Sequence, residues 1–319
     1  MNNRQGSVLD KELYTGAPIE RAHLHRGFTS KKTPVKWIRF FRACVLQRQV
    51  AEDEKKKKIK EMWKFFFIYL AISFSCLIFS GVLPFLSLIF PFLFFFVFMF
   101  LIIAIIQNYR INQKFKKNFT NGFDFFADYF SAFFTLIEED LQPLSKINLK
   151  ANLKETISKD NLIKKDKYDS KTSGFLSGKE NYYERIISSG SCFFSDSSLV
   201  SFQFTEKIRE RIINKRGRIS GKRKTKYKFK SVYPFAIKMK IPKSKYNLKS
   251  NINQEDTNMI EEGDFYVFKA FRKFDTKKER PTEYNPHIKN SITAFGIDYF
   301  SLEIINLINT CYSCVTPKT

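Results

Sequence analysis

The chain has 319 residues, with 55 Lys and Arg against 31 Asp and Glu, and its formal net charge is +24. A hydrophobic content of 44% with 37 Phe excludes a chain that is disordered throughout. Five Cys exclude a disulfide-dense scaffold, and 12 Gly with 10 Pro exclude a collagen-like or linker-dominated chain. The excess of positive charge favours anionic partners.

The first segment, residues 1–32, is mixed polar and predicted to be disordered, and we expect residues 1–30 to be mostly unstructured. Thr33 and Pro34 then form a typical helix start, with Thr as N-cap and Pro as the first helical residue. Residues 33–64 are predicted to form a basic amphipathic helix. Its apolar stripe consists of Val35, Ile38, Phe41 and Val45, with Trp37 beside it. This stripe could lie on the anionic inner leaflet of a membrane or pack against the C-terminal domain, and both interpretations remain open.

A block of 42 residues, 65–106, contains no Asp, Glu, Lys, Arg or His. Because one membrane-spanning helix needs about 20 apolar residues, this block is long enough for two. The central sequence Ser80-Gly81-Val82-Leu83-Pro84 suits a turn, which predicts helices over about 65–80 and 84–107. A break nearer Pro91 is the alternative. Residues 65–107 are thus predicted to form a transmembrane hairpin.

The charges on either side of this block predict its orientation. Before it lie Lys55, Lys56, Lys57, Lys58, Lys60 and Lys64, and after it lie Arg110, Lys114, Lys116 and Lys117. The positive-inside rule then places both termini in the cytoplasm. Since the spans carry no ionisable acid or base other than Tyr69 and Cys76, the hairpin is predicted to be an anchor and not a transporter.

Residues 108–143 are predicted to form a juxtamembrane amphipathic helix, strongest over about 112–140, with one Phe-rich face. From residue 144 to 319 the chain reads as a β-rich domain, because apolar and polar residues alternate from Ile147 to Lys154. Further strands are predicted over 182–194, 199–213, 224–230, 232–241 and 265–271, with a turn at 195–198, surface loops over 155–181 and 247–264, and a last amphipathic helix from Ile297 to Ile308.

Together these elements predict a membrane-anchored α+β protein. A two-helix transmembrane hairpin is followed by a cytoplasmic antiparallel β domain that helices flank.

The densest positive charge lies between residues 206 and 245, where 16 Lys and Arg face only two Glu. If the central part is a strand, its lysines share one face while Arg223, Thr225, Tyr227 and Phe229 share the other, which could pack on a core. We single out as an anion-binding candidate the set Lys222, Arg223, Lys224, Lys226, Lys228 and Lys230. Three interpretations compete: a solvated edge strand, a contact with anionic phospholipid or an acidic protein, and nucleic-acid binding. Nucleic acid is less favoured, because Tyr227 and Phe229 face away from the lysines.

No catalytic, cofactor-binding or metal-ligating set is recognised, and no cofactor is expected. The pair Cys311 and Cys314 lies at the end of the last helix without further ligands, and three His are too few for a named catalytic arrangement. The sequence therefore predicts an integral membrane protein that tethers a basic binding or scaffold domain to the bilayer. The alternatives are a membrane-bound enzyme with an unrecognised site and a membrane-tethered nucleic-acid binder.

Overall fold

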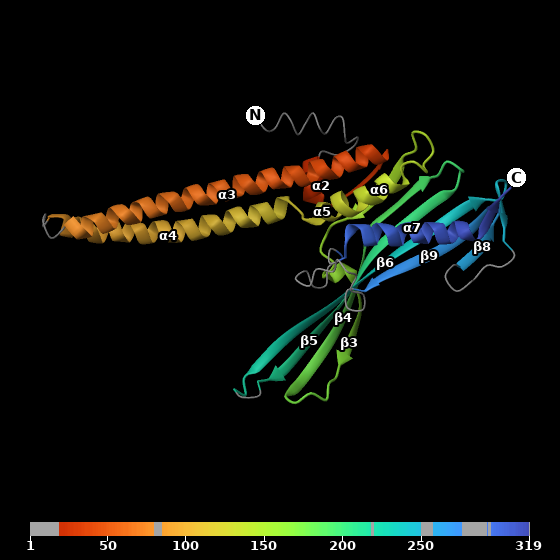
Figure 1. Cartoon of the computed structure of the whole chain (residues 1–319). Coiled ribbons are helices and arrows are strands. Elements are labelled where there is room, and N and C mark those ends of the chain that lie inside the picture. Colours follow the sequence, from red (N-terminus) through yellow and green to blue (C-terminus); the bar gives the residue numbers. More distant parts are fainter. Residues whose placement is uncertain are drawn as a thin grey trace. The chain divides into compact units, whose positions relative to one another are not determined.

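The computed structural model describes residues 19–79, 85–217, 220–249, 258–275, 292 and 295–318. The chain divides into two compact units, one of residues 1–42 with 122–319 and the other of residues 43–121. The first unit is an α+β body and the second is a pair of long helices, and their elements are labelled in Figure 1. The predicted α+β class with an antiparallel sheet is therefore confirmed.

The helical unit consists of most of α3 (Pro34–Phe79) together with α4 (Phe85–Asn118). The predicted helix start at Pro34 is confirmed, and α3 runs without a break to Phe79. The predicted turn at 80–84 lies outside the described residues. Pro91 lies inside α4, so the alternative break at that residue is wrong.

The two long helices run antiparallel to each other. The rings of Tyr69 and Phe100 stack with centroids 4.8 Å apart, and the ammonium of Lys55 lies 4.3 Å from the ring centroid of Phe115. Partners that are early in α3 are thus late in α4. The small side chains of Ser73 on α3 and Ala104 on α4 are buried.

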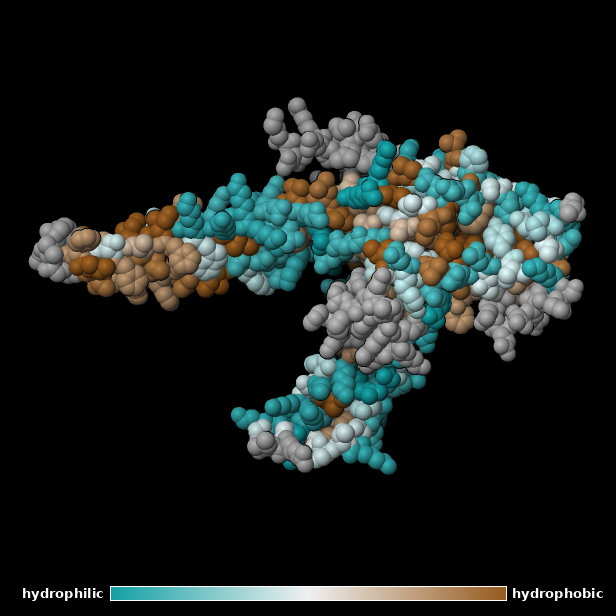
Figure 2. Space-filling view, in the orientation of Figure 1, coloured by the Kyte–Doolittle hydropathy of each residue, from teal (hydrophilic) through white to brown (hydrophobic). Residues whose placement is uncertain are grey.

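Both helices are long and apolar enough to cross a membrane, judged by length and composition. Core helices of soluble proteins are largely buried, whereas in each apolar window here only a small share of the residues, 6% and 11%, is buried. In Figure 2 one end of the helix pair is hydrophobic and the other end is hydrophilic. An exposed apolar surface of this kind is typical of a membrane or protein interaction site.

The body is built on one antiparallel sheet whose strands lie in the order β1-β2-β4-β5-β6-β9-β8, with β3 also paired to β4. A separate two-stranded sheet joins β7 (Tyr246–Leu248) to β10 (Val315–Pro317). The strands of the large sheet are β1 (Gly27–Lys32), β2 (Ile147–Asn152), β3 (Leu162–Tyr168), β4 (Phe175–Phe193), β5 (Leu199–Arg216), β6 (Arg223–Pro242), β8 (Asn258–Glu262) and β9 (Phe265–Asp275).

The strands predicted near 147, 182, 199, 224–241 and 265 are confirmed, although β4, β5, β6 and β9 are longer than predicted. Three expectations are wrong. The predicted loop 155–181 contains β3 and the start of β4, and the predicted loop 247–264 contains β8 and part of β7. The N-terminal segment expected to be unstructured contains α2 (Ile19–His25) and β1. Residues 1–18 of this N-terminal segment lie outside the described residues. β1 and β3 are polar, so their strand conformation depends on pairing, β1 with the distant β2 and β3 with the next strand, β4.

The helix predicted over 112–140 is interrupted. After α4 ends at Asn118, the chain forms α5 (Gly122–Phe125), a π-helical turn (Phe126–Phe130) and α6 (Ser131–Ile137). A Cβ atom on Gly122 would lie only 2.8 Å from Cδ2 of Leu153, so a larger residue there would force the leucine side chain to shift.

One face of the sheet is covered by the segment α5–α6 and by α7 (Ile297–Ser313), which confirms the predicted last helix. Phe125 stacks on Phe204 of β5 with ring centroids 5.4 Å apart, and Phe300 of α7 meets Phe235 of β6 at 6.0 Å. The Phe-rich face of the predicted juxtamembrane helix is therefore a core contact.

The first turns of α3 belong to the same core. Trp37, Phe40 and Phe41 are fully buried, and the indole Nε1 of Trp37 donates a hydrogen bond of 2.9 Å to the carbonyl oxygen of Ile147. Of the two interpretations of this helix, the structure shows packing against the C-terminal domain. The stripe itself is displaced, because Val35 is 41% exposed.

We predict that Trp37→Ala lowers the free energy of unfolding by about 3–5 kcal/mol, because it removes a fully buried indole and leaves the Ile147 carbonyl without its donor. Thermal unfolding of the full chain in detergent measures the change. Val35→Ala is the matched control on the same helix, with an expected effect within about 0.5 kcal/mol. An equally small effect of Trp37→Ala would contradict this packing.

The turn between β4 and β5 is tied to the end of α7 through Asp196. Its carboxylate accepts hydrogen bonds from the backbone N–H and hydroxyl of Ser198, both at 2.8 Å, from Tyr246 at 2.9 Å and from Tyr312 at 2.8 Å. Burial opposes the charged form, but these bonds outweigh it and lower the pKa of Asp196. Burial and the same carboxylate raise the pKa of Tyr246 to about 12.

We predict that the Asp196 carboxylate makes the free energy of unfolding depend on pH in the acidic range. Since the pKa of Asp196 is lower in the folded state, its contribution is present above the unfolded value of about 3.9 and is lost as the pH falls through the folded value. Asp196→Asn should cost about 1–3 kcal/mol at pH 7, and the difference from the unmodified protein should shrink below about pH 4. Urea unfolding across pH tests this, with the exposed Asp169→Asn as control. A cost independent of pH would contradict it.

Candidate functional site

The strands β3 to β6 continue beyond the helix-covered part of the sheet, as Figure 1 shows. We call the part formed by residues 162–186 and 207–232 the arm. Both of its faces lack a helix layer within the described residues. Side chains on both faces of β6 are exposed there, including Lys226 on one face and Tyr227, 56% exposed, on the other.

Cross-strand side-chain contacts hold the arm together without a helix layer. Glu180 accepts hydrogen bonds from Arg211 Nε at 2.6 Å and from Tyr182 at 2.5 Å, and the Arg211 guanidinium lies 3.9 Å from the ring centroid of Tyr168. Burial works against ionised Glu180, but these hydrogen bonds and the arginine charges lower its pKa. This group links β3, β4 and β5.

The structure brings the predicted lysines onto one face of the arm. Cross-strand pairing sets Lys224 opposite Lys215, Lys228 opposite Arg211 and Lys230 opposite Arg209, and Lys226 lies between them on the same face. Lys222 is exposed and precedes the strand. Arg223 lies on the other face with Thr225, Tyr227 and Phe229. The expectation that this other face could pack on a core is wrong, because Arg223, Thr225 and Tyr227 are exposed.

Charges at the base of the arm are balanced, and charges at its tip are not. Lys230 pairs with the buried Asp275 at 2.8 Å, and Lys207 pairs with Glu184 at 2.9 Å. By contrast, Lys224, Lys226 and Lys228 form no ion pair with any residue that the structure describes. Like charges that share one face repel each other, so an anion bound at the tip would stabilise it.

The lysine face of the arm is continuous with the face of the body that the helices leave uncovered. The β5–β6 pairing keeps one register from Leu199 opposite Lys240 to Arg216 opposite Arg223, without a bulge. Side chains that alternate along these strands therefore stay on the same face, which the strand twist turns gradually. Lys238 thus lies on the same face as Lys228. We call the uncovered face of the body the open face.

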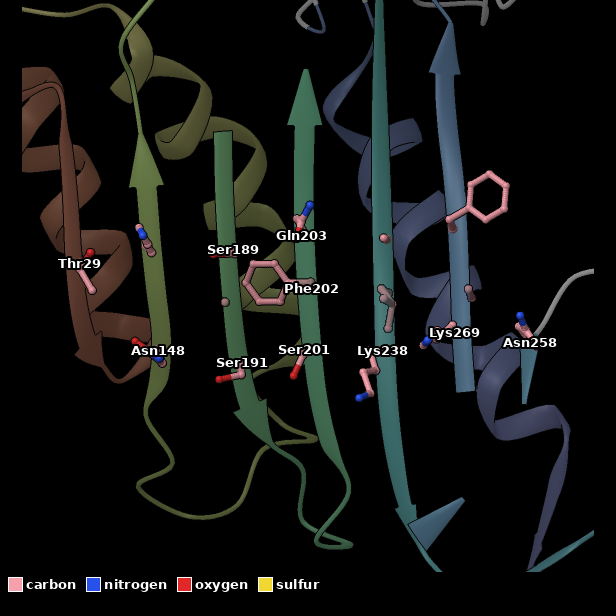
Figure 3. A pocket seen from close by; sticks show the side chains of 16 residues that line it. Thr29, Asn148, Ser189, Ser191, Ser201, Phe202, Gln203, Lys238, Asn258 and Lys269 are labelled. Carbon is pink, nitrogen blue, oxygen red and sulfur yellow. The ribbon is translucent and has the colours of Figure 1, made fainter. Parts of the chain in front are cut away.

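The open face contains a shallow groove with a volume of about 1070 Å³. Figure 3 shows it crossing the strands, with small polar side chains in front of the sheet and helices behind. Neutral hydrogen-bonding groups, lysines and apolar residues line it, and none of its lining residues is a carboxylate. The neutral groups are Thr29, Asn148, Ser189, Ser191, Ser201, Gln203 and Asn258, and the lysines are Lys150, Lys238 and Lys269.

Two features of the groove are unusual for a solvated sheet face. Lys238 and Lys269 are direct cross-strand neighbours, an arrangement that is unfavourable for two like charges. Glu262 offsets only part of this repulsion, because it lies 3.8 Å from Lys238 and is closer to Lys240, at 2.9 Å. Phe271 is 71% exposed and lies opposite Ala236, whose small side chain leaves the phenyl ring open.

The remaining chemistry-bearing residues form no reactive centre in the described part of the chain. Burial, together with the neighbouring Cys314, raises the pKa of the Cys311 thiol to about 12, so it stays protonated at neutral pH. No group of three or more His, Cys, Asp or Glu among the described residues could hold a metal ion.

Sequence reasoning singled out the arm lysines but missed the groove. A signal was present, because residues 201–204 alternate polar residues with buried Phe, and the stretch from Ile237 to Ile241 alternates lysines with buried apolar residues. That alternation predicts one solvated face for each strand. It does not reveal that β2, β4, β5, β6 and β9 are adjacent, and only adjacency gathers these residues into one groove.

The chain matches no protein-family model, no curated protein and no solved structure. Geometry and charge are therefore the grounds for a functional proposal.

We predict that the arm lysines differ in reactivity toward an amine-acylating reagent. Lys224, Lys226 and Lys228 should react several-fold faster than Lys230, because the ion pair with Asp275 holds and shields the Lys230 ammonium. Mass spectrometry of brief acylation time courses on the full chain measures each rate. Asp275→Asn should raise the rate at Lys230 and leave that at Lys226 unchanged. Equal rates at Lys230 and Lys226 in the unmodified protein would contradict this arrangement.

Proposed function

We propose that this is an integral membrane protein in which α3 and α4 span the bilayer as a hairpin. The hairpin tethers a basic cytoplasmic domain, and the tip of the arm contacts anionic phospholipid. In this proposal the protein is a binding or scaffold module, and both termini lie on the cytoplasmic side.

The observation that carries the hairpin is the pairing of β1 with β2. These strands precede and follow the two apolar helices in the chain, and they are hydrogen-bonded neighbours from Gly27 opposite Asn152 to Lys32 opposite Ile147. Two paired strands lie on the same side of any membrane. An even number of crossings between them is therefore required, and two suitable helices are present.

The charges flanking the helices support the orientation. Because Lys55 meets the ring of Phe115, the basic segments before and after the apolar block lie at the same end of the helix pair. Lysine-rich flanks at one end and an apolar opposite end are typical of a hairpin that enters from the cytoplasmic side. The apolar side chains would then face lipid, which accounts for their exposure.

The unbalanced charge at the arm tip supports the lipid contact. Lys224, Lys226 and Lys228 follow one another at every second residue on one strand face, where they are exposed and have no carboxylate partner among the described residues. Each lysine near an anionic membrane contributes about 1 kcal/mol, and the tether keeps their local concentration near the bilayer high. A flat row of charges without a pocket suits a diffuse anionic surface.

The test places a fluorophore at the arm tip of the full chain. The native thiols Cys44, Cys192, Cys311 and Cys314 are buried and Cys76 lies in the apolar part of α3, so a cysteine introduced by Ser220→Cys can be labelled selectively. With an environment-sensitive dye there, we expect a blue shift when neutral nanodiscs are replaced by discs containing anionic lipid, or when anionic liposomes are added.

The combined change of Lys224, Lys226 and Lys228 to Gln should abolish this shift, and high salt should weaken it. The matched control is the change of Lys164, Lys165 and Lys167 on β3 to Gln, which should leave most of the shift. If the unmodified protein shows no shift with either lipid source, the proposed lipid contact is wrong. Extraction of the protein by alkaline carbonate would refute the membrane-spanning hairpin.

A further inference from the structure

We propose that the groove on the open face binds single-stranded nucleic acid, with its lysines holding phosphates and Phe271 stacking on a base. This goes beyond the proposed lipid contact, because the groove lies on the body of the sheet and the lipid-binding lysines lie at the arm tip. The ion pairs of Lys230 and Lys207 separate these two surfaces with a balanced stretch.

The positive charge of the groove favours binding of a polyanion. Lys150, Lys238 and Lys269 are exposed around it, and no lining residue is acidic. Lys238 beside Lys269 is an unfavourable cross-strand pair that Glu262, 3.8 Å from Lys238, offsets only in part, and a phosphate bound between them would attract both ammonium groups. A neutral saccharide would leave this repulsion in place.

The shallow, elongated shape of the groove favours binding of an extended ligand. Small molecules bind in concave pockets that bury most of their surface, whereas this groove is shallow and runs across the strands from Thr29 on β1 to Asn258 on β8. Between Lys150 on β2 and Lys269 on β9 there are four strand spacings, or about 19 Å. A polymer can contact both ends of such a groove at once.

The exposed ring distinguishes nucleic acid from an acidic peptide. A phenyl ring with an open face, such as that of Phe271, provides a stacking platform for a base, whereas the carboxylate side chains of an acidic peptide do not stack on aromatic rings. The neighbouring Ser189, Ser201 and Gln203 offer donors and acceptors that base edges can use. At the arm, Tyr227 and Phe229 lie on the face away from the lysines, whereas Phe271 and the three lysines all line the groove.

The test uses the full chain in neutral nanodiscs and a fluorescein-labelled 12-nucleotide oligouridylate, with affinity measured by fluorescence anisotropy across a salt series. All variants carry Lys224, Lys226 and Lys228 as Gln, so the arm tip does not contribute. Three phosphate contacts predict a slope of log K against log salt of about −2, since each contact on a single strand contributes about −0.7.

The two kinds of residue should give different signatures. Lys269→Gln or Lys238→Gln should make the slope less steep by about 0.7. Phe271→Ala should weaken binding by about 5- to 150-fold at every salt concentration without changing the slope, and Phe271→Trp should restore the affinity. The matched controls Lys167→Gln and Tyr227→Ala, which change a lysine and an exposed aromatic residue of the arm, should change neither quantity.

Three outcomes would overturn the proposal. The first is no binding of the oligonucleotide at low salt by the arm variant. The second is binding that depends on the lysines but is the same for Phe271→Ala and Phe271→Trp, which would indicate charge attraction alone. The third is a polyglutamate peptide that competes at lower concentration than unlabelled oligouridylate, which would make the groove a site for acidic peptides. Thermal unfolding of each variant verifies that its fold is intact. A failed lipid test with a successful oligonucleotide test would refute the arm proposal and leave this one standing.

Discussion

The pairing of β1 with β2 is the constraint on which the rest of the molecule depends. It joins a strand that precedes the long helices to one that follows them, so the helical unit is an insertion between two neighbouring strands. The buried Trp37 reinforces this junction, because its indole donates to the carbonyl of Ile147 in the strand beside β1. A fragment that begins after the helices would lose β1 and this indole together, so the body is not a separable C-terminal piece.

The second constraint is the unbroken register between β5 and β6. Side chains alternate along both strands, and no bulge reverses that alternation over their whole length. One face therefore carries Phe204 and Phe235 into the core beneath α7, and the other carries Lys238 and, further along, Lys228. Where helices cover the sheet, the covered face is aromatic. Where no helix covers the sheet, contacts of tyrosine and arginine side chains with Glu180 stabilise the pairing of the strands.

Elements whose own sequence carries a strong period could be predicted: the apolar helices, α7, and strands such as β2 and β5. β1 and β3 could not, because both are polar segments without a clear apolar period. Gly27–Lys32 becomes a strand by pairing with the distant β2, and Leu162–Tyr168 by pairing with β4. The arm lysines were visible as a local alternation, which is why their common face could be anticipated. The groove could not be anticipated, since Lys150, Lys238 and Lys269 come from three strands that only the strand order brings together.

The distribution of ion pairs gives the basic surface its organisation. If every lysine on the β5–β6 face were free, the surface would be one continuous stripe of charge, and any polyanion could bind along it. Instead, Asp275, Glu184 and Glu180 neutralise the middle of that face, through Lys230, Lys207 and Arg211. Two separate regions of net positive charge remain, one flat at the arm tip and one in the groove beside Phe271, where Glu262 offsets only part of the charge. Their different shapes favour different anions, so a single basic face can serve a membrane at one end and a polymer at the other.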